Sequence, residues 1–435
     1  MSSLPVELLI EIFTHSLPET PSNPSIHDSP LLLTRVCRLW HDVALATPLL
    51  WTSFSVNFAL YEDTLPFQIA KLWLSRSQNL PLSIYVDDSL DGDDDPEPQR
   101  WAFYEELCRH AHRWQNAALN LPFTILWRLP IQQPLGMLES LKMGRDDSGQ
   151  SVPNRKVSTF MTAPRLKSVE IWLDNDEAMN IQGIGLPWAQ LTVFRGRLFT
   201  NDECLFVLLQ APQLVECDFN DIVDGYVPDA NVVTPFLRVL QLDEASGHSC
   251  ACILSFLTAP NLNKFICGAR KQDDTDDNSL WPLREFLSRS CSSLTQLHIS
   301  MNQSTREWDK LMLCLPFMSL LEHLEIFWFH EDFDLTPLSD ALLPRLRTLV
   351  FNSHTVPGNV TVMNLLSLLL VRTSEEWVVT NGVCLGRFKF TWPFIFVDLH
   401  PDEDPEIQSR VRLLRKRGVH IHMGGMEWGF HFFDC

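Results

Sequence analysis

The chain has few basic residues and no long apolar segment. Lys and Arg together number 34 against 54 Asp and Glu, so the formal net charge at pH 7 is -20. Nucleic acids and anionic membranes attract cationic proteins, so we expect neither as a partner of so acidic a chain. Apolar runs such as residues 365–371 fall far short of the roughly 20 residues that cross a bilayer.

Sequence motifs of common catalytic sites are also missing. The chain has no Gly-rich phosphate loop, no Gly-x-Ser-x-Gly and no His-Glu-x-x-His. The pairs His110/His112 and His420/His422 could share one face of a strand, but neither has a third ligand close in sequence. We therefore expect no catalytic residue, no bound metal and no cofactor.

The 11 cysteines are scattered and odd in number, which is typical of reduced thiols. The first residues carry Glu7 and Glu11 and lack the basic segment of a secretion signal. Together these features predict a cytoplasmic or nuclear protein. The basic residues at 410–417 are interpreted as the end of a repeat helix, where the helix dipole favours cations, and nuclear targeting is the alternative.

The length of 435 residues and the 45% hydrophobic composition indicate a globular chain of two or three domains, or one repeat array. The first fifty residues predict two helices. The first opens at Leu4, with Pro5 at the position where a missing N–H costs nothing. Leu4, Leu8 and Ile12 form one apolar stripe, which Leu9 and Phe13 widen.

A Pro-rich loop over residues 17–30 follows, and then a second helix over residues 31–46 with a wide apolar face. The two helices carry more apolar surface than they can bury on each other, which predicts a partner surface. That partner is either another protein or the rest of this chain, on which the helices would form a cap.

These residues resemble the F-box family. Four blocks occur in the family's order: Leu4-Pro5-Val6-Glu7-Leu8-Leu9, Ile12-Phe13, Val36-Cys37-Arg38-Leu39-Trp40 and Leu50-Trp51. The resemblance covers about 50 of the 435 residues. The Pro-rich insert between the first two helices is longer than in the compact F-box, and we expect it to bulge from the first loop.

The resemblance implies docking on a Skp-type adaptor and, through it, on a cullin. The residues that match the motif are expected to contact the adaptor or to support those contacts. They are Leu4, Pro5, Leu8, Leu9, Ile12, Phe13, Val36, Cys37, Trp40 and Trp51. The sequence does not separate contact residues from supporting residues.

The rest of the chain repeats the pattern Leu-x-x-φ-x-φ, in which φ is apolar, at intervals of 23 to 32 residues. Leucine-rich repeats have periods of about 20–29 residues. Copies begin at Leu138, Leu166, Leu191, Leu214, Leu237, Leu262, Leu294, Leu321 and Leu346, with weaker copies at Trp114 and Leu385. Helical stretches lie between several of them. The segment resembles irregular leucine-rich repeats, and a non-repeating α/β domain is the alternative.

Strand residues alternate between faces, so the x positions beside the φ positions should line the concave face of the sheet. We call this set the x row, and its mixture of charges and aromatic rings suits a protein target. The expected target contacts are Glu170, Trp172, Arg195, Arg197, Asp218, Asp243, His298, His323, Glu325 and Phe327. Glu216, Gln241, Lys264, Gln296 and Thr348 complete the row.

The predicted fold class is therefore α/β. Residues 1–55 form an all-helical F-box-like domain, residues 56–100 a linker with a helix, a strand and an acidic loop, and residues 101–435 a repeat solenoid. The solenoid should be a curved, mostly parallel sheet with outer helices. The resemblance implies a substrate-recognition subunit of a cullin-RING ubiquitin ligase that binds an unknown target protein. The alternatives are a repeat scaffold that recruits no ligase and an enzyme that acts on a small molecule.

Overall fold

The structure is a computed structural model that describes residues 4–60, 65–88, 98–144, 157–172, 181–226, 231–244, 249–269, 282–290, 293–300, 305–329, 333–339, 342–353, 358–392 and 404–425. The chain divides into two compact units. Unit 1 comprises residues 1–199 and unit 2 comprises residues 200–435.

The described strands confirm an α/β architecture with an all-parallel sheet. Unit 1 contributes β1 (Ser53–Asn57), β2 (Leu82–Asp87), β3 (Trp114–Asn120), β4 (Ser140–Gly144), β5 (Ser168–Trp172) and β6 (Val193–Arg197). Unit 2 contributes β7 (Glu216–Ile222), β9 (Val239–Glu244), β11 (Lys264–Ala269), β12 (Gln296–Ser300), β13 (His323–Phe329), β14 (Thr348–Ser353), β15 (Arg387–Trp392) and β16 (His420–Gly425). Within each unit the strands follow chain order. A small separate pair joins β8 (Val232–Val233) to β10 (Leu257–Thr258).

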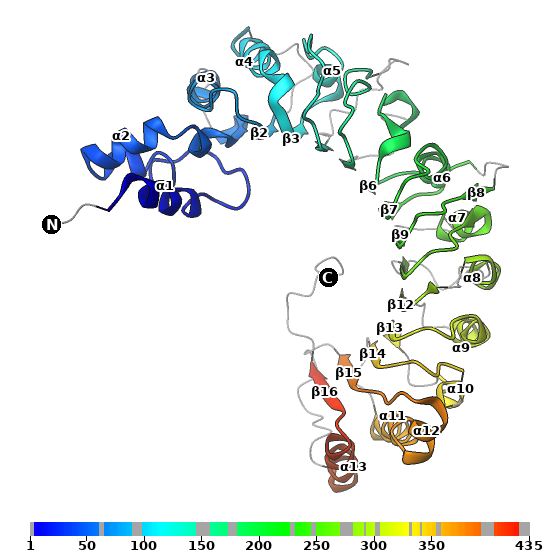
Figure 1. Ribbon diagram of the computed structural model, residues 1–435. Helices are drawn as coiled ribbons and strands as arrows, with labels where there is room; N and C mark the ends of the chain where they lie inside the picture. Colours follow the sequence, from blue (N-terminus) through cyan, green and yellow to red (C-terminus); the bar gives the residue numbers. More distant parts are fainter. Residues whose placement is uncertain are drawn as a thin grey trace. The chain divides into compact units, whose positions relative to one another are not determined.

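In each unit helices lie between several of the strands, along one side of the sheet (Figure 1). Unit 1 has α1 (Val6–His15), α2 (Arg38–Ala46), α3 (Leu65–Arg76), α4 (Pro98–Arg109) and α5 (Phe123–Leu126). Unit 2 has α6 (Asn201–Gln210), α7 (Ser249–Phe256), α8 (Leu283–Ser290), α9 (Thr305–Met312), α10 (Thr336–Ser339), α11 (Asn359–Arg372), α12 (Glu375–Asn381) and α13 (Pro405–Lys416). No helix in the described ranges is both long enough and apolar enough to cross a membrane.

The core consists of the repeated apolar positions. All nine leucines that open the predicted copies are at most 2% exposed, and the apolar side chains at the following φ positions are buried as well. Stacked repeats bury each other's apolar faces, which a single strand–helix unit cannot do. The pattern therefore predicted the main-sheet strands from β3 to β15 and their buried positions correctly, and the arrangement is compatible with leucine-rich repeats.

One φ position holds Gly196, and the structure shows why. A Cβ atom on Gly196 would lie 2.2 Å from the ring of Phe199. Phe199 is itself 1% exposed and contacts the ring of Phe194, with the ring centres 5.9 Å apart. Phe199 thus fills the space that an apolar side chain occupies in the other copies.

The parallel sheet begins earlier in the chain than the repeat pattern indicated. β1 pairs with β2, and β2 with β3, with Phe54 beside Ile84 and Val56 beside Val86. Within residues 56–100, where a helix and a strand were expected, the structure has α3 and β2. Most of the expected acidic loop lies outside the described residues.

Asp88 belongs to that acidic stretch and is not solvated. It is 2% exposed and accepts hydrogen bonds from the Tyr104 hydroxyl and, at 3.1 Å, from Arg100. Burial and the negative charge of Asp88 both raise the pKa of Tyr104, so this phenol stays protonated and donates to the carboxylate.

The second helix is shorter than the sequence predicted. Residues 31–46 divide into a 3-10 turn at Leu33–Arg35 and α2, with Cys37 extended between them (φ -160°, ψ 169°). The Thr34 hydroxyl donates to the Leu31 carbonyl at 2.7 Å. Such local bonds offer the backbone an alternative to continuous helix.

The Pro-rich segment does not bulge away from the molecule as expected. The backbone N–H of Ser55 in β1 donates to the Ser22 carbonyl at 3.1 Å, and the Ser55 hydroxyl donates to Asn23 at 2.9 Å. The segment therefore covers part of the outer edge of β1. Covering an edge strand removes backbone groups that could pair with another chain.

Candidate functional site

Helix α1 presents two different apolar faces. Leu9 and Phe13 are buried, whereas Leu4, Leu8 and Ile12 are each about half exposed. The exposed three follow the i, i+4, i+8 spacing of one helical stripe and line a shallow surface groove together with Glu11, His15 and Ser16. We call Leu4, Leu8 and Ile12 the α1 stripe.

Exposed apolar side chains are concentrated in this part of the chain. Among the described residues, 25 large apolar side chains are exposed, and nine of them lie within residues 4–49. The nine are Leu4, Val6, Leu8, Ile12, Ile26, Leu32, Val36, Leu39 and Leu49. Scattered exposed leucines are normal, but a dense group of them is typical of an interaction surface.

Aromatic side chains hold the N-terminal helices together and attach them to the first repeat. The rings of Phe13 and Trp40 lie 4.9 Å apart, which joins α1 to α2. Trp51 donates its indole N–H to the Ala44 carbonyl at 3.0 Å and contacts the ring of Trp73 in α3, 4.9 Å away. Arg76 lies over the same Trp51 ring at 4.2 Å. Trp51 is thus a structural anchor.

The structure separates the ten residues that match the motif into two groups. Leu9, Phe13 and Trp51 are buried, and Trp40 is half-buried against Phe13. Leu4, Pro5, Leu8, Ile12, Val36 and Cys37 are exposed. The first group can support a docking surface, and only the second can contribute much contact area to it.

The x row is less exposed than expected. Glu170 is 8% exposed, and its carboxylate pairs with Lys142 of the neighbouring strand at 2.9 Å. Asp243 is also buried, and Asp218 and Phe327 are half-buried. Trp172, Arg195 and Arg197, on β5 and β6, are exposed as expected, and Trp172 lies beside Arg197 in the strand register. Whether any of these residues contacts a target stays a prediction.

Three of the predicted target contacts form a cluster of their own in unit 2. The Nδ1 atom of His298 on β12 lies 2.7 Å from Oε2 of Glu325 on β13. Nε2 of His323 lies 3.7 Å from the same oxygen, and the two imidazole rings stack at 4.8 Å. We call these residues the β12–β13 cluster.

Electrostatics favour the charged carboxylate in the β12–β13 cluster. Burial alone would raise the pKa of Glu325. Hydrogen bonds from His298 and Asn352, the nearby ring of His323 and the charge of His298 outweigh burial and hold this pKa well below its ordinary value. Repeat alignment could have found the pair, because residue 298 and residue 325 occupy equivalent positions of consecutive copies and are register partners.

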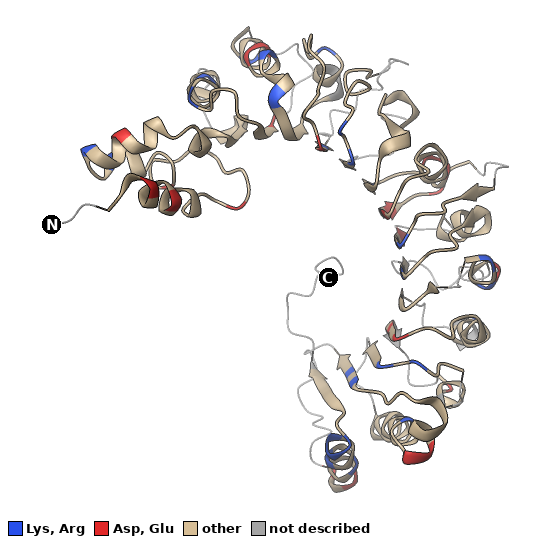
Figure 2. Ribbon diagram, viewed as in Figure 1, with Lys and Arg blue, Asp and Glu red and all other residues tan. Residues whose placement is uncertain are grey.

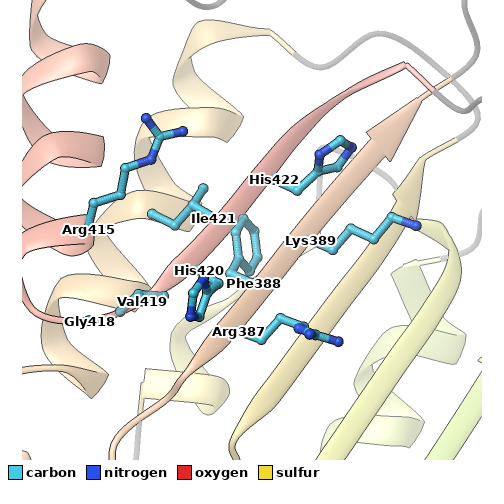
Figure 3. Close-up of a pocket in the computed structure, with 9 residues that line it drawn as sticks. All are labelled: Arg387, Phe388, Lys389, Arg415, Gly418, Val419, His420, Ile421 and His422. Carbon is cyan, nitrogen blue, oxygen red and sulfur yellow. The ribbon is translucent and has the colours of Figure 1, made fainter.

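A basic pocket of about 480 Å³ lies at the C-terminal end of unit 2 (Figure 3). Arg387 and Lys389 come from β15, His420 and His422 are their register partners on β16, and Arg415 comes from α13. Basic residues also gather along α13 itself, as Figure 2 shows. The residues that line the pocket include no acidic group, so the pocket can attract an anion.

Comparison with models of known protein families finds none that matches the chain, and a search of curated proteins finds no match either.

Proposed function

We propose that this protein is a substrate-recognition subunit of a Skp–cullin–F-box ubiquitin ligase. In this proposal the N-terminal helices dock on a Skp-type adaptor, which links the chain to a cullin. The repeats hold a target protein. The chain makes and breaks no bond itself, and it raises the effective concentration of a target lysine near the ubiquitin-loaded enzyme.

The observation that carries the proposal is the α1 stripe. Its three side chains lie on a helix whose opposite face is already buried, and about half the surface of Leu4, Leu8 and Ile12 stays open to a partner. A groove lined by such side chains suits an apolar partner surface, and they occupy positions of the motif that resembles the F-box.

A scaffold that recruits no ligase is the second candidate, and a different observation favours it. Trp51 contacts α3, and Ser55 of β1 contacts the Pro-rich segment. A cap on the first repeat would require such contacts. A cap can also carry a docking surface, so cullin recruitment is the property that separates the two candidates.

Co-expression of the full chain with a Skp-type adaptor and a cullin tests the proposal. We expect all three to co-purify and to elute together in size-exclusion chromatography. Recovery of the adaptor without the cullin would support the scaffold. Recovery of neither would contradict docking, and the N-terminal helices would then act as a cap alone.

A further inference from the structure

We infer that His298, His323 and Glu325 form a binding site for one divalent transition-metal ion, with zinc the best match. Within the described residues, this is the one group of three or more His, Cys, Asp or Glu whose candidate ligand atoms all lie within 4.8 Å of one another. The inference does not depend on the proposed function, and it departs from the expectation that no metal is bound.

The strand register explains why these side chains converge. His298 and Glu325 are direct partners on the parallel strands β12 and β13. His323 lies two residues before Glu325 on the same strand, so both side chains leave the same face of the sheet. Two histidines and one carboxylate are therefore held on neighbouring, hydrogen-bonded backbone segments.

The distances suit zinc. A tetrahedral zinc ion with bonds of about 2.0 Å holds its ligand atoms about 3.3 Å apart. The two measured separations from Glu325 Oε2, 2.7 Å to His298 Nδ1 and 3.7 Å to His323 Nε2, lie on either side of that value. Small rotations of the side chains would bring one nitrogen of each ring and the carboxylate oxygen to coordination distance.

Each histidine also has a nitrogen atom in need of a partner. Nε2 of His298 and Nε2 of His323 are buried and make no hydrogen bond to the described residues. A buried polar atom without a hydrogen-bond partner is unfavourable. Coordination of a metal ion by Nε2 would give that atom a partner at His323, because Nε2 is the nitrogen of His323 that faces Glu325.

The carboxylate has the outer support that metal ligands usually have. Asn352 on β14 donates its side-chain N–H to Oε1 of Glu325 at 2.9 Å, so the ion would bind Oε2 and replace the hydrogen bond between Oε2 and His298. Thr391 on β15 donates its hydroxyl to the Asn352 oxygen at 2.5 Å and so fixes the amide. Asn352 and Thr391 are both buried. Partners of this kind orient the ligands of metal sites.

The donor set favours zinc over magnesium or calcium. Imidazole nitrogens suit zinc, copper, iron and nickel, whereas magnesium and calcium prefer oxygen ligands. Three protein ligands leave a fourth position, which water or a group of a bound molecule can occupy.

The test uses tag-free full-length protein, stripped of metal with a chelator and dialysed, with zinc chloride as the probe. Isothermal titration with elemental analysis should give about one tightly bound zinc per chain. His323→Gln and Glu325→Gln should each weaken zinc binding by at least about 100-fold, and Asn352→Ala by about tenfold. The matched control is the exposed pair on β16, where His420→Gln with His422→Gln should leave the affinity unchanged.

Cobalt(II) supplies a second readout that needs no variant. Cobalt in a site with two imidazoles and a carboxylate should give visible d–d bands without the strong near-ultraviolet band of thiolate ligands. Absence of zinc binding, a thiolate band, or an affinity unchanged in both ligand variants would overturn the inference. Circular dichroism shows whether each variant folds. If a variant does not fold, the cobalt spectrum of the wild-type chain tests the inference in its place.

Discussion

Leu8 and Leu9 are consecutive residues of α1 with opposite surroundings, since Leu8 is 46% exposed and Leu9 is 2% exposed. The helix turns by about 100° per residue, so neighbours in sequence point in different directions. One leucine is therefore available to a partner while the other holds the helix in place.

This relationship predicts different effects of the two truncations. Leu9→Ala should lower the free energy of unfolding by about 2–5 kcal/mol, because it leaves a cavity in the core. Leu8→Ala should change it by less than about 0.5 kcal/mol, as is usual for a surface position. Urea unfolding of both variants measures the difference. A Leu8→Ala variant as unstable as Leu9→Ala would show that Leu8 is part of the core.

Arg372 should be essential to the packing of α11. It is 1% exposed, and its guanidinium donates to the carbonyls of Leu338 at 2.5 Å and Leu343 at 2.9 Å. Burial lowers the pKa of Arg372 to about 10, so the group remains charged at neutral pH. Arg372→Met leaves both carbonyls without a hydrogen-bond donor and should lower the free energy of unfolding by about 3 kcal/mol.

The control for this variant is Arg347→Met. The Arg347 side chain is 63% exposed and has a long contact of 4.0 Å with Glu322. Its loss should cost less than about 1 kcal/mol, as is usual for an exposed ion pair. Equal unfolding midpoints for the two methionine variants would refute the role given to Arg372.

Cysteine reactivity provides a test that combines the fold with the proposed docking surface. Burial raises the pKa of Cys108 to about 12 and that of Cys314 to about 11, so both thiols stay protonated at pH 8 and should resist alkylation. Among the nine cysteines of the described residues, Cys37 is the exposed one and should react first. Peptide mapping by mass spectrometry after a short iodoacetamide pulse identifies the labelled thiols.

A bound adaptor should slow the labelling of Cys37, because Cys37 is among the exposed residues that match the motif. Cys252 is half-buried and lies on α7 of unit 2, and its slow labelling should not change. Early labelling of Cys108 would contradict the buried position of α4.

The repeat pattern predicted most strands and the core because the leucine of each copy occupies the same buried position. β1 escaped the pattern because Trp51 stands where the other copies have leucine. In β2 the buried Leu82 is the register partner of Trp114, but it comes two rather than three residues before Ile84. The alternation of apolar residues indicated β2, whereas β1 became visible only through its pairing with β2.

The candidate site was harder to predict. Leu4, Leu8, Leu9, Ile12 and Phe13 are all apolar, and helical spacing alone does not say which of them face Trp40 and the rest of the core. The β12–β13 cluster joins His298 to His323 and Glu325, which follow it 25 and 27 positions later in the chain. Only alignment of consecutive repeats, which fixes the strand register, brings His298 beside Glu325.

The affinity of a Skp-type adaptor for the full chain tests the central claim most directly. The variant is Leu8→Ala with Ile12→Ala, and the matched control is Leu209→Ala with Leu413→Ala, two exposed leucines on α6 and α13. We predict that the first pair weakens binding by about 100-fold, as for two interface anchors, and that the control pair leaves the dissociation constant unchanged. Equal affinities for the wild-type chain and both variants, or no binding by the wild-type chain, would contradict the account.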